Sequence, residues 1–84
     1  MIEGPILRTL LKVLHLVGST GLRLEVLLDE VYITCAARPS GELIREHLRH
    51  AEDEKLVTFK RGLANELRYY ITALGEQAYR EANQ

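Results

Sequence analysis

Two arginines, Arg45 and Arg49, stand one helical turn apart in the middle of the chain, so that a helix there presents both on one side. A guanidinium group is planar and binds phosphate or the edge of a base through two parallel hydrogen bonds. Ser40 lies just upstream and adds a hydroxyl group. Four further basic side chains flank this segment: Arg38, Lys60, Arg61 and Arg68. Their chemistry is recognition of anions, not the making or breaking of bonds.

Other chemistry has little support in the sequence. The single cysteine, Cys35, cannot form an internal disulfide, and its helical spacing predicts a buried core thiol in a reducing cytoplasm. His47 and His50 are three residues apart without a third ligand at suitable spacing, so we expect partly exposed helix histidines and no metal site. There is no glycine-rich phosphate loop or nucleophile elbow. We therefore expect neither an enzyme nor a cofactor.

The length and net charge of the chain limit the number of domains and the kinds of partner that can be expected. A chain of 84 residues predicts one domain, residues 1–84, with a small core that pairing with a second copy would help to stabilise. Eleven basic and twelve acidic residues give a net charge of −1, whereas a dedicated non-specific nucleic-acid binder is usually basic. Arg8 and Lys12 interrupt the first apolar run, so we expect no membrane span and a cytoplasmic protein.

Hydrophobic periodicity predicts three helices in the first part of the chain: Gly4–Val17, Arg23–Ala36 and Gly41–Glu54. Pro5 suits a first helical turn, and Ser40 suits the N-cap of the third helix. The expected inward positions are Ile6, Leu10, Val13, Leu14 and Val17, then Leu24, Leu27, Leu28, Val31 and Cys35, then Ile44, Leu48 and Ala51. Leu7, Leu11 and Leu16 fall outside the first of these faces. They need a second cover, either the last helix of the same chain or a dimer partner.

The second part predicts a hairpin. Leu56–Lys60 and Leu67–Thr72 have β-type composition, and Arg61–Glu66 forms the loop between them. Tyr69 is expected in the core with Tyr70 on the other sheet face, while Leu22 makes one extended contact with the hairpin. Thr72 caps a last helix from Ala73 to about Ala82. The fold class is α+β, mainly α: a three-helix bundle, a two-stranded wing and a C-terminal helix.

Two phrases in this region resemble winged helix-turn-helix regulators of the MarR and PadR type. In that family the recognition helix ends in a leucine-acidic-acidic-x-glycine-leucine-valine phrase, which corresponds here to residues 51–57, AEDEKLV. The second wing strand ends in tyrosine, an aliphatic residue and threonine before a helical glycine, as in residues 69–75, YYITALG. Lys55 stands where the family prefers glycine, at a position that often needs a left-handed backbone. Ala51 replaces leucine, so packing under the wing is thinner or filled by an aromatic such as Phe59.

The resemblance implies a small DNA-binding transcriptional regulator or accessory factor of bacterial or phage type, acting as a homodimer through its first and last helices. The third helix would enter the major groove, with Ser40, Arg45 and Arg49 as contacts. Phosphates or the minor groove would meet the remaining basic residues: Arg38, Lys60, Arg61 and Arg68.

Acidic residues favour a different interpretation of the same helix. Glu42 and Glu46 each precede an arginine by three residues, which is typical of a solvated, salt-bridged helix face. Between Arg38 and Arg68 there are seven basic and six acidic residues, a net charge of only about +1. The alternative is therefore a winged-helix module that binds protein and not DNA, through Leu7, Leu11 and the loop residue Leu63.

Overall fold

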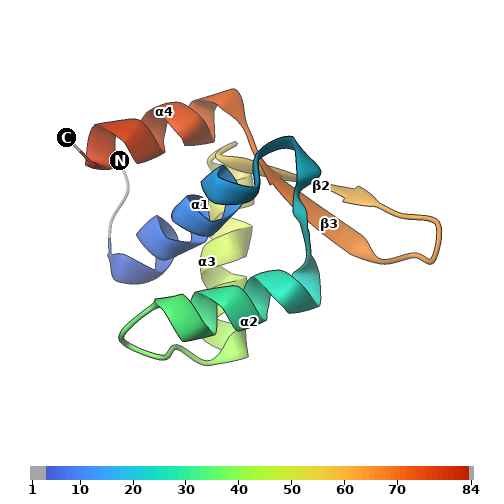
Figure 1. The fold of residues 1–84 in the computed structure, drawn as a ribbon, viewed down its shortest axis with the longest axis horizontal. Coiled ribbons are helices and arrows are strands. Elements are labelled where there is room, and N and C mark those ends of the chain that lie inside the picture. Colours follow the sequence, from blue (N-terminus) through green and yellow to red (C-terminus); the bar gives the residue numbers. More distant parts are fainter. Residues whose placement is uncertain (1–3, 84) are drawn as a thin grey trace.

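The computed structural model describes residues 4–83 and contains four α-helices, one short 3-10 helix and three strands (Figure 1). In chain order these are α1 (Pro5–Val17), η1 (Gly18–Thr20), β1 (Leu22–Arg23), α2 (Leu24–Thr34), α3 (Gly41–Asp53), β2 (Val57–Arg61), β3 (Leu67–Ile71) and α4 (Ala73–Ala82). The predicted order of elements is confirmed. The main differences from the prediction are in the bounds of elements. Helix α2 ends at Thr34 and not at Ala36, and Arg61 belongs to β2 and not to the loop.

Helix α1 lies at the centre of the bundle. It contacts α2, α3, α4 and β3, so it is covered on several sides (Figure 1). Leu10, Leu11 and Leu14 are completely buried, and Leu7 is 3% exposed. Of the two covers predicted for Leu7 and Leu11, the one within the same chain is therefore confirmed, and neither residue is available to bind another protein. Leu16, the third residue predicted to need a second cover, is 71% exposed.

The other predicted core positions are mostly confirmed. Leu27, Val31, Cys35, Ile44, Leu48 and Ala51 are buried, together with Val57 and Tyr69 of the sheet. Leu24 and Leu28, placed in the same stripe as Leu27, are only partly buried at the edge of the core. Phe59 does not fill the space beneath the wing: it is 44% exposed and packs beside Tyr69, with ring centroids 5.6 Å apart.

The sheet is antiparallel in the order β1-β3-β2. Leu22 pairs with Tyr69, which confirms the predicted extended contact, and Tyr69 pairs on its other side with Phe59. Gly21 leads into this edge strand with φ +66°, and a Cβ there would lie 2.6 Å from the Tyr70 ring. Both the backbone conformation and the close approach of the ring require glycine at this position.

The junction between α3, the wing and α4 explains both phrases of the family resemblance. Lys55 has φ 65°, so it adopts the left-handed conformation for which glycine is preferred. The Thr72 hydroxyl donates to the carbonyl oxygens of Lys55 (2.7 Å) and Leu56 (3.0 Å) and accepts from Gly75 N (2.9 Å), so it caps α4 as predicted. A Cβ on Gly75 would lie 2.1 Å from the Leu56 carbonyl oxygen. Glycine is therefore needed where α4 crosses the start of the wing.

Candidate nucleic-acid interface

The N-terminus of α3 is built by Ser40. Its Oγ accepts a hydrogen bond from Leu43 N at 3.2 Å, which is the predicted N-cap. Ser40 is exposed, and Glu42 follows in the first turn. A Ser cap fixes where the helix starts and therefore fixes which side chains share each face. The cap role of Ser40 is thus structural; a DNA contact from the same hydroxyl stays a prediction.

Arg45 and Arg49 are both exposed on the flank of α3 that faces the sheet. They border a hollow of about 140 Å³ that is also lined by Leu24, Leu48, Glu52, Leu67 and Tyr69. The predicted pairing of the two guanidinium groups on one side of α3 is therefore confirmed. Their direction adds something that the sequence did not show: they point into the space between α3 and the wing.

Glu52 lies in the same hollow. Burial raises the pKa of its carboxyl, and the neighbouring Tyr69 hydroxyl and Arg49 partly offset that rise. Burial also raises the pKa of Tyr69, with the Glu52 charge adding to the effect. A carboxylate is thus placed beside the two arginines in surroundings that disfavour its charge.

The outermost face of α3 is acidic. At about 100° per residue, Glu42, Glu46 and Asp53 lie opposite the buried face formed by Ile44 and Leu48. The predicted salt bridges from Glu42 to Arg45 and from Glu46 to Arg49 are not formed. Within residues 4–83, the one pair of an acidic and a basic side chain with an N–O distance within 4.0 Å is His15–Glu76, which joins α1 to α4. The arginines of α3 are therefore not tied to their acidic neighbours.

The sheet divides the basic residues of the wing. Side chains alternate between faces along a strand, so Arg61 shares a face with Phe59 and, through its partner Leu67, with Tyr69. This is the face that borders the hollow. Lys60 and Arg68 lie on the opposite face. The structure therefore brings Arg61 to the side of Arg45 and Arg49, and separates it from Lys60 and Arg68.

The predicted contact residues differ in how tightly they are positioned. Arg61 donates to Asn65 Oδ1 at 3.1 Å, and the Lys60 ammonium lies 5.5 Å from the centre of the Tyr70 ring. Arg68 Nε donates to the Thr20 carbonyl oxygen at 2.8 Å and ties the wing to the turn before β1.

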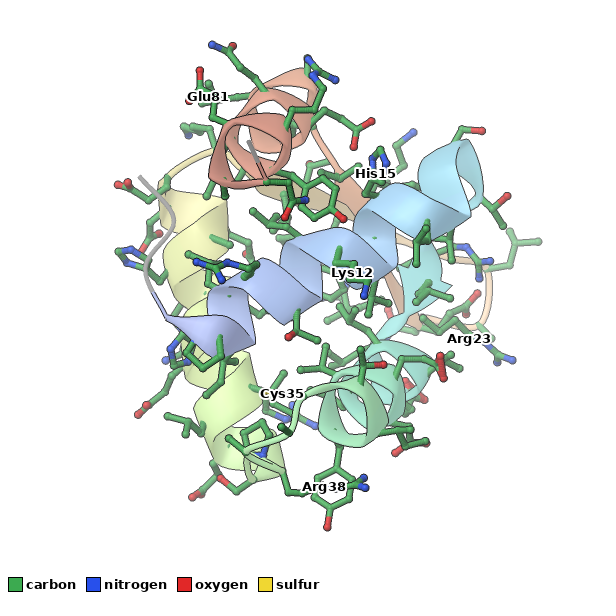
Figure 2. The ribbon with its side chains drawn as sticks, turned by 60° about the vertical axis from the view of Figure 1, so that its left-hand side comes forward. Lys12, His15, Arg23, Cys35, Arg38 and Glu81 are labelled. Atoms are coloured by element: carbon green, nitrogen blue, oxygen red, sulfur yellow. The ribbon has the colours of Figure 1, made fainter. Side chains whose placement is uncertain are left out.

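Arg38 lies beyond the C-terminal end of α2 (Figure 2). Its guanidinium group is 5.4 Å from the centre of the Tyr32 ring, and its Nη1 is 3.5 Å from the Tyr32 carbonyl oxygen. Its φ of 50° places the backbone in the left-handed region just before Pro39. Arg38 therefore packs on α2, while its predicted phosphate contact stays a prediction.

One basic residue was missed in the sequence. Arg23 is directly opposite Arg68 across β1 and β3, and Arg68 is directly opposite Lys60 across β3 and β2. We call Arg23, Arg68 and Lys60 the basic row. The predicted contact of Leu22 with the hairpin was the signal for it, but the pairing register that aligns the three residues could not be counted from sequence.

The remaining reactive side chains have structural positions. Cys35 is 2% exposed, which confirms a core thiol. His47 is partly buried with its Nδ1 2.9 Å from the Leu43 carbonyl oxygen, and His50 is exposed. His15 Nδ1 lies 2.6 Å from Glu76 Oε1, and its ring stacks on Tyr79 with centroids 4.7 Å apart.

Residues 4–83 contain no cluster of three or more His, Cys, Asp or Glu suited to hold a metal ion. In the same residues, no helix has the length and hydrophobicity needed to cross a membrane.

Comparison with known proteins bears on the fold. The sequence matches no protein-family model and no curated protein. Among solved structures, it is similar to the S. aureus MepR–DNA complex, with a TM-score of 0.78 and 15% identity over 95% of this chain and 61% of the MepR chain. A glycine-to-lysine mutant of S. aureus MepR gives a TM-score of 0.77 and 15% identity over 94% of this chain and 55% of that one.

A third structure is a phenylalanine-to-leucine mutant of S. aureus MepR bound to an oligodeoxyribonucleotide. It gives a TM-score of 0.72 and 17% identity over 89% of this chain and 51% of that one. This chain therefore spans about half to three-fifths of the length of the MepR structures that it matches. The likeness is one of fold, and together with the order of helices and the paired hairpin it shows that the chain has a winged helix-turn-helix fold like that of MepR.

Proposed function

We propose that this chain, residues 1–84 as one domain, is a small double-stranded-DNA-binding protein. Its role would be that of a cytoplasmic transcriptional regulator or accessory factor of bacterial or phage type, without enzymatic activity. The observation that carries the proposal is the exposure of Arg45 and Arg49 on α3, in the hollow beside the wing. MepR supports it, because a MepR–DNA complex has the same fold over 95% of this chain.

In this proposal α3 enters the major groove on its wing-side flank. Arg45 and Arg49 contact base edges there, and Ser40 lies at the end of the helix nearest the groove. Arg61 contacts phosphates from the same side of the sheet, and Arg38, Lys60 and Arg68 supply further phosphate contacts. The acidic outer face of α3 favours this orientation, because Glu42 and Glu46 would repel a phosphate backbone placed directly over them.

The proposal includes a homodimer through the first and last helices. Its support is limited to side chains that remain uncovered in one copy: Leu16 of α1 is 71% exposed and Leu74 of α4 is 50% exposed. Leu7 and Leu11 take no part, since they are buried within the chain. Sedimentation equilibrium measures the mass directly. A concentration-independent mass of about 9.6 kDa, that of one chain, would exclude the dimer.

The test of DNA binding is titration of the purified protein with random duplex DNA from low to physiological salt. We expect micromolar affinity that falls steeply as salt increases, because binding to phosphates releases counterions. The double variant Arg45→Ala/Arg49→Ala is compared with Arg8→Ala/Arg80→Ala, which removes the same charge from α1 and α4. Absence of binding by the wild-type protein at low salt would contradict the proposal.

A second candidate function is a winged-helix module that binds another protein. One observation favours it: Leu63 at the tip of the wing is completely exposed, with a relative exposure of 109%. Three residues were predicted to form a protein-binding surface: Leu7, Leu11 and Leu63. Only Leu63 is exposed, because the other two are buried within the chain. A protein that fails to bind DNA at low salt, yet keeps its fold, would shift the preference to this candidate.

A further inference from the structure

We infer that the basic row, Arg23, Arg68 and Lys60, is a second phosphate-binding surface that contacts the backbone of nucleic acid on the sheet face turned away from Arg45 and Arg49. The inference rests on the proposed function and adds to it a binding surface and a residue, Arg23, that belongs neither to α3 nor to the hairpin. Its ligand is the sugar-phosphate backbone of one DNA strand, without base recognition.

The geometry of the row follows from the strand register. Arg23 pairs with Arg68, and Arg68 pairs with Lys60, so the three side chains leave the same face of the sheet in a line across the strands. Adjacent strands are about 4.8 Å apart, so the row is about 10 Å long. Successive phosphates of one B-DNA strand rotate around the helix axis as they rise along it, so a straight row of this length can face about two of them.

Repulsion between the three positive charges of the basic row destabilises the sheet unless an anion lies over them. Like charges directly opposite each other on neighbouring strands destabilise a sheet, and here two such pairs share one residue. Arg68 is fixed by its 2.8 Å hydrogen bond to the Thr20 carbonyl oxygen, and Lys60 lies over the Tyr70 ring. These contacts use neutral partners, so they position the charges without neutralising them. A phosphate backbone would remove the repulsion.

The row and the α3 hollow cannot bind the same phosphate. Tyr69, Phe59 and Leu67 fill the sheet face that borders the hollow, and the three strands separate them from the row. Arg23 is also placed far from Arg38, since the two lie at opposite ends of α2 (Figure 2). Occupation of both surfaces therefore requires a longer stretch of DNA than α3 alone would cover.

The test compares two double variants that each remove two positive charges. Arg23→Ala/Lys60→Ala removes the two exposed ends of the row and leaves Arg68, whose hydrogen bond supports the fold. Arg8→Ala/Arg80→Ala is the matched control, because both residues are exposed on helices outside the row. Binding to a random duplex is measured at several salt concentrations, and circular dichroism with thermal unfolding establishes that each variant keeps its fold.

We expect the row variant to bind more weakly than the control at every sequence tested. The slope of log affinity against log salt should become shallower by about two, since each lost phosphate contact contributes about 0.9. Equal affinity and equal slope for the two variants, with wild-type binding intact, would overturn the row and leave the proposed function standing. No binding by the wild-type protein at low salt would overturn both.

Discussion

The two sides of the sheet each have three basic residues, in different settings: one side is shared by α3 and the wing, and the other is the sheet face turned away from α3. On the face toward α3, Arg61 lies on the same side as Arg45 and Arg49, and this side also contains Glu52 in the hollow. On the opposite face, Arg23, Arg68 and Lys60 form a continuous line with no carboxylate between them in the register. The first setting favours selective contacts, since acids oppose a general attraction for phosphate. The second favours contacts that are independent of sequence.

This comparison explains how a chain with a net charge of −1 can still present basic surfaces. Net charge sums over the whole molecule, whereas binding depends on the charges that share one face. Here the sheet separates six basic residues into two groups of three. The low sum over residues 38–68 therefore understates the local charge on each face.

The largest expected effect comes from removing the support that both faces share. Gly75→Ala places a Cβ about where the Leu56 carbonyl oxygen lies, at 2.1 Å, so α4 must move away from the wing. We expect a loss of about 3 kcal/mol in the free energy of unfolding, measured by urea denaturation. Gly41→Ala is the control, because a Cβ there meets nothing within 4 Å. Equal stability of the two variants would mean that the junction is not needed.

The next effect distinguishes the faces from each other. Arg45→Ala should weaken binding to a specific site by about 1–3 kcal/mol and change random DNA far less. Lys60→Ala, from the opposite face, should weaken every sequence alike and make the salt dependence shallower. Arg61→Ala should resemble Lys60→Ala, because its role is also a phosphate contact. Competition binding with specific and random duplexes measures all three. Identical behaviour of the Arg45 and Lys60 variants would remove the distinction between base contacts made by α3 and phosphate contacts made by the wing.

A smaller effect concerns the turn between α3 and the wing. Lys55 has φ 65°, a conformation that costs a non-glycine residue about 1 kcal/mol. Lys55→Gly should therefore be more stable than Lys55→Ala by about 1 kcal/mol in thermal or urea unfolding. Both variants lack the same charge and should bind DNA equally. A difference in DNA affinity between them would show that this turn controls how the two faces are placed.

The smallest effect is that of the carboxylate in the hollow. Glu52→Gln removes a negative charge beside Arg45 and Arg49, so DNA affinity at neutral pH should rise by up to about fivefold, or roughly 1 kcal/mol. Asp53→Asn removes the same charge from the outer face of α3 and serves as the control. An equal rise in both variants would mean that the position of Glu52 in the hollow has no special effect.

Glu52 also predicts a pH dependence of stability. Because burial raises the pKa of Glu52 above its ordinary value of 4.5, the folded protein binds this proton more tightly than the unfolded chain. The contribution of Glu52 to stability is therefore present below about pH 4.5 and is lost as pH rises through the raised pKa. Urea unfolding at pH 4 and pH 7 should show that the stability of Glu52→Gln relative to the wild type is greater at pH 7 than at pH 4. An unchanged difference would contradict this.

Much of the fold could be predicted because the decisive signals are local. Helical periodicity placed Ile44 and Leu48 inside α3, strand alternation placed Tyr69 in the core, and Lys55 was recognised as a left-handed position. These properties depend on residues close in sequence. Whether the same chain or a dimer partner covers Leu7 and Leu11 stayed open in the sequence, because the answer depends on helices that come later in the chain and surround α1.

The candidate site was predicted less well, since it depends on pairing between distant segments. Lys60, Arg61 and Arg68 were grouped as one wing surface, but a strand turns successive side chains to opposite faces, and the register decides which ones meet. Arg23 entered the site only through its pairing with Arg68, 45 residues later by their numbers. The expected salt bridges along α3 had correct spacing, but spacing alone does not bring two exposed side chains together.

Thr72 has a consequence for how motion passes through the molecule. It is the single residue between β3 and α4, and its hydroxyl also binds the carbonyl oxygens of Lys55 and Leu56 just after α3. The hairpin and α4 thus have no flexible linker between them, and both are tied to the end of α3. We therefore expect a displacement of α4 to move the hairpin and the end of α3 with it, which would couple a contact made at α4 to the surfaces proposed to bind DNA.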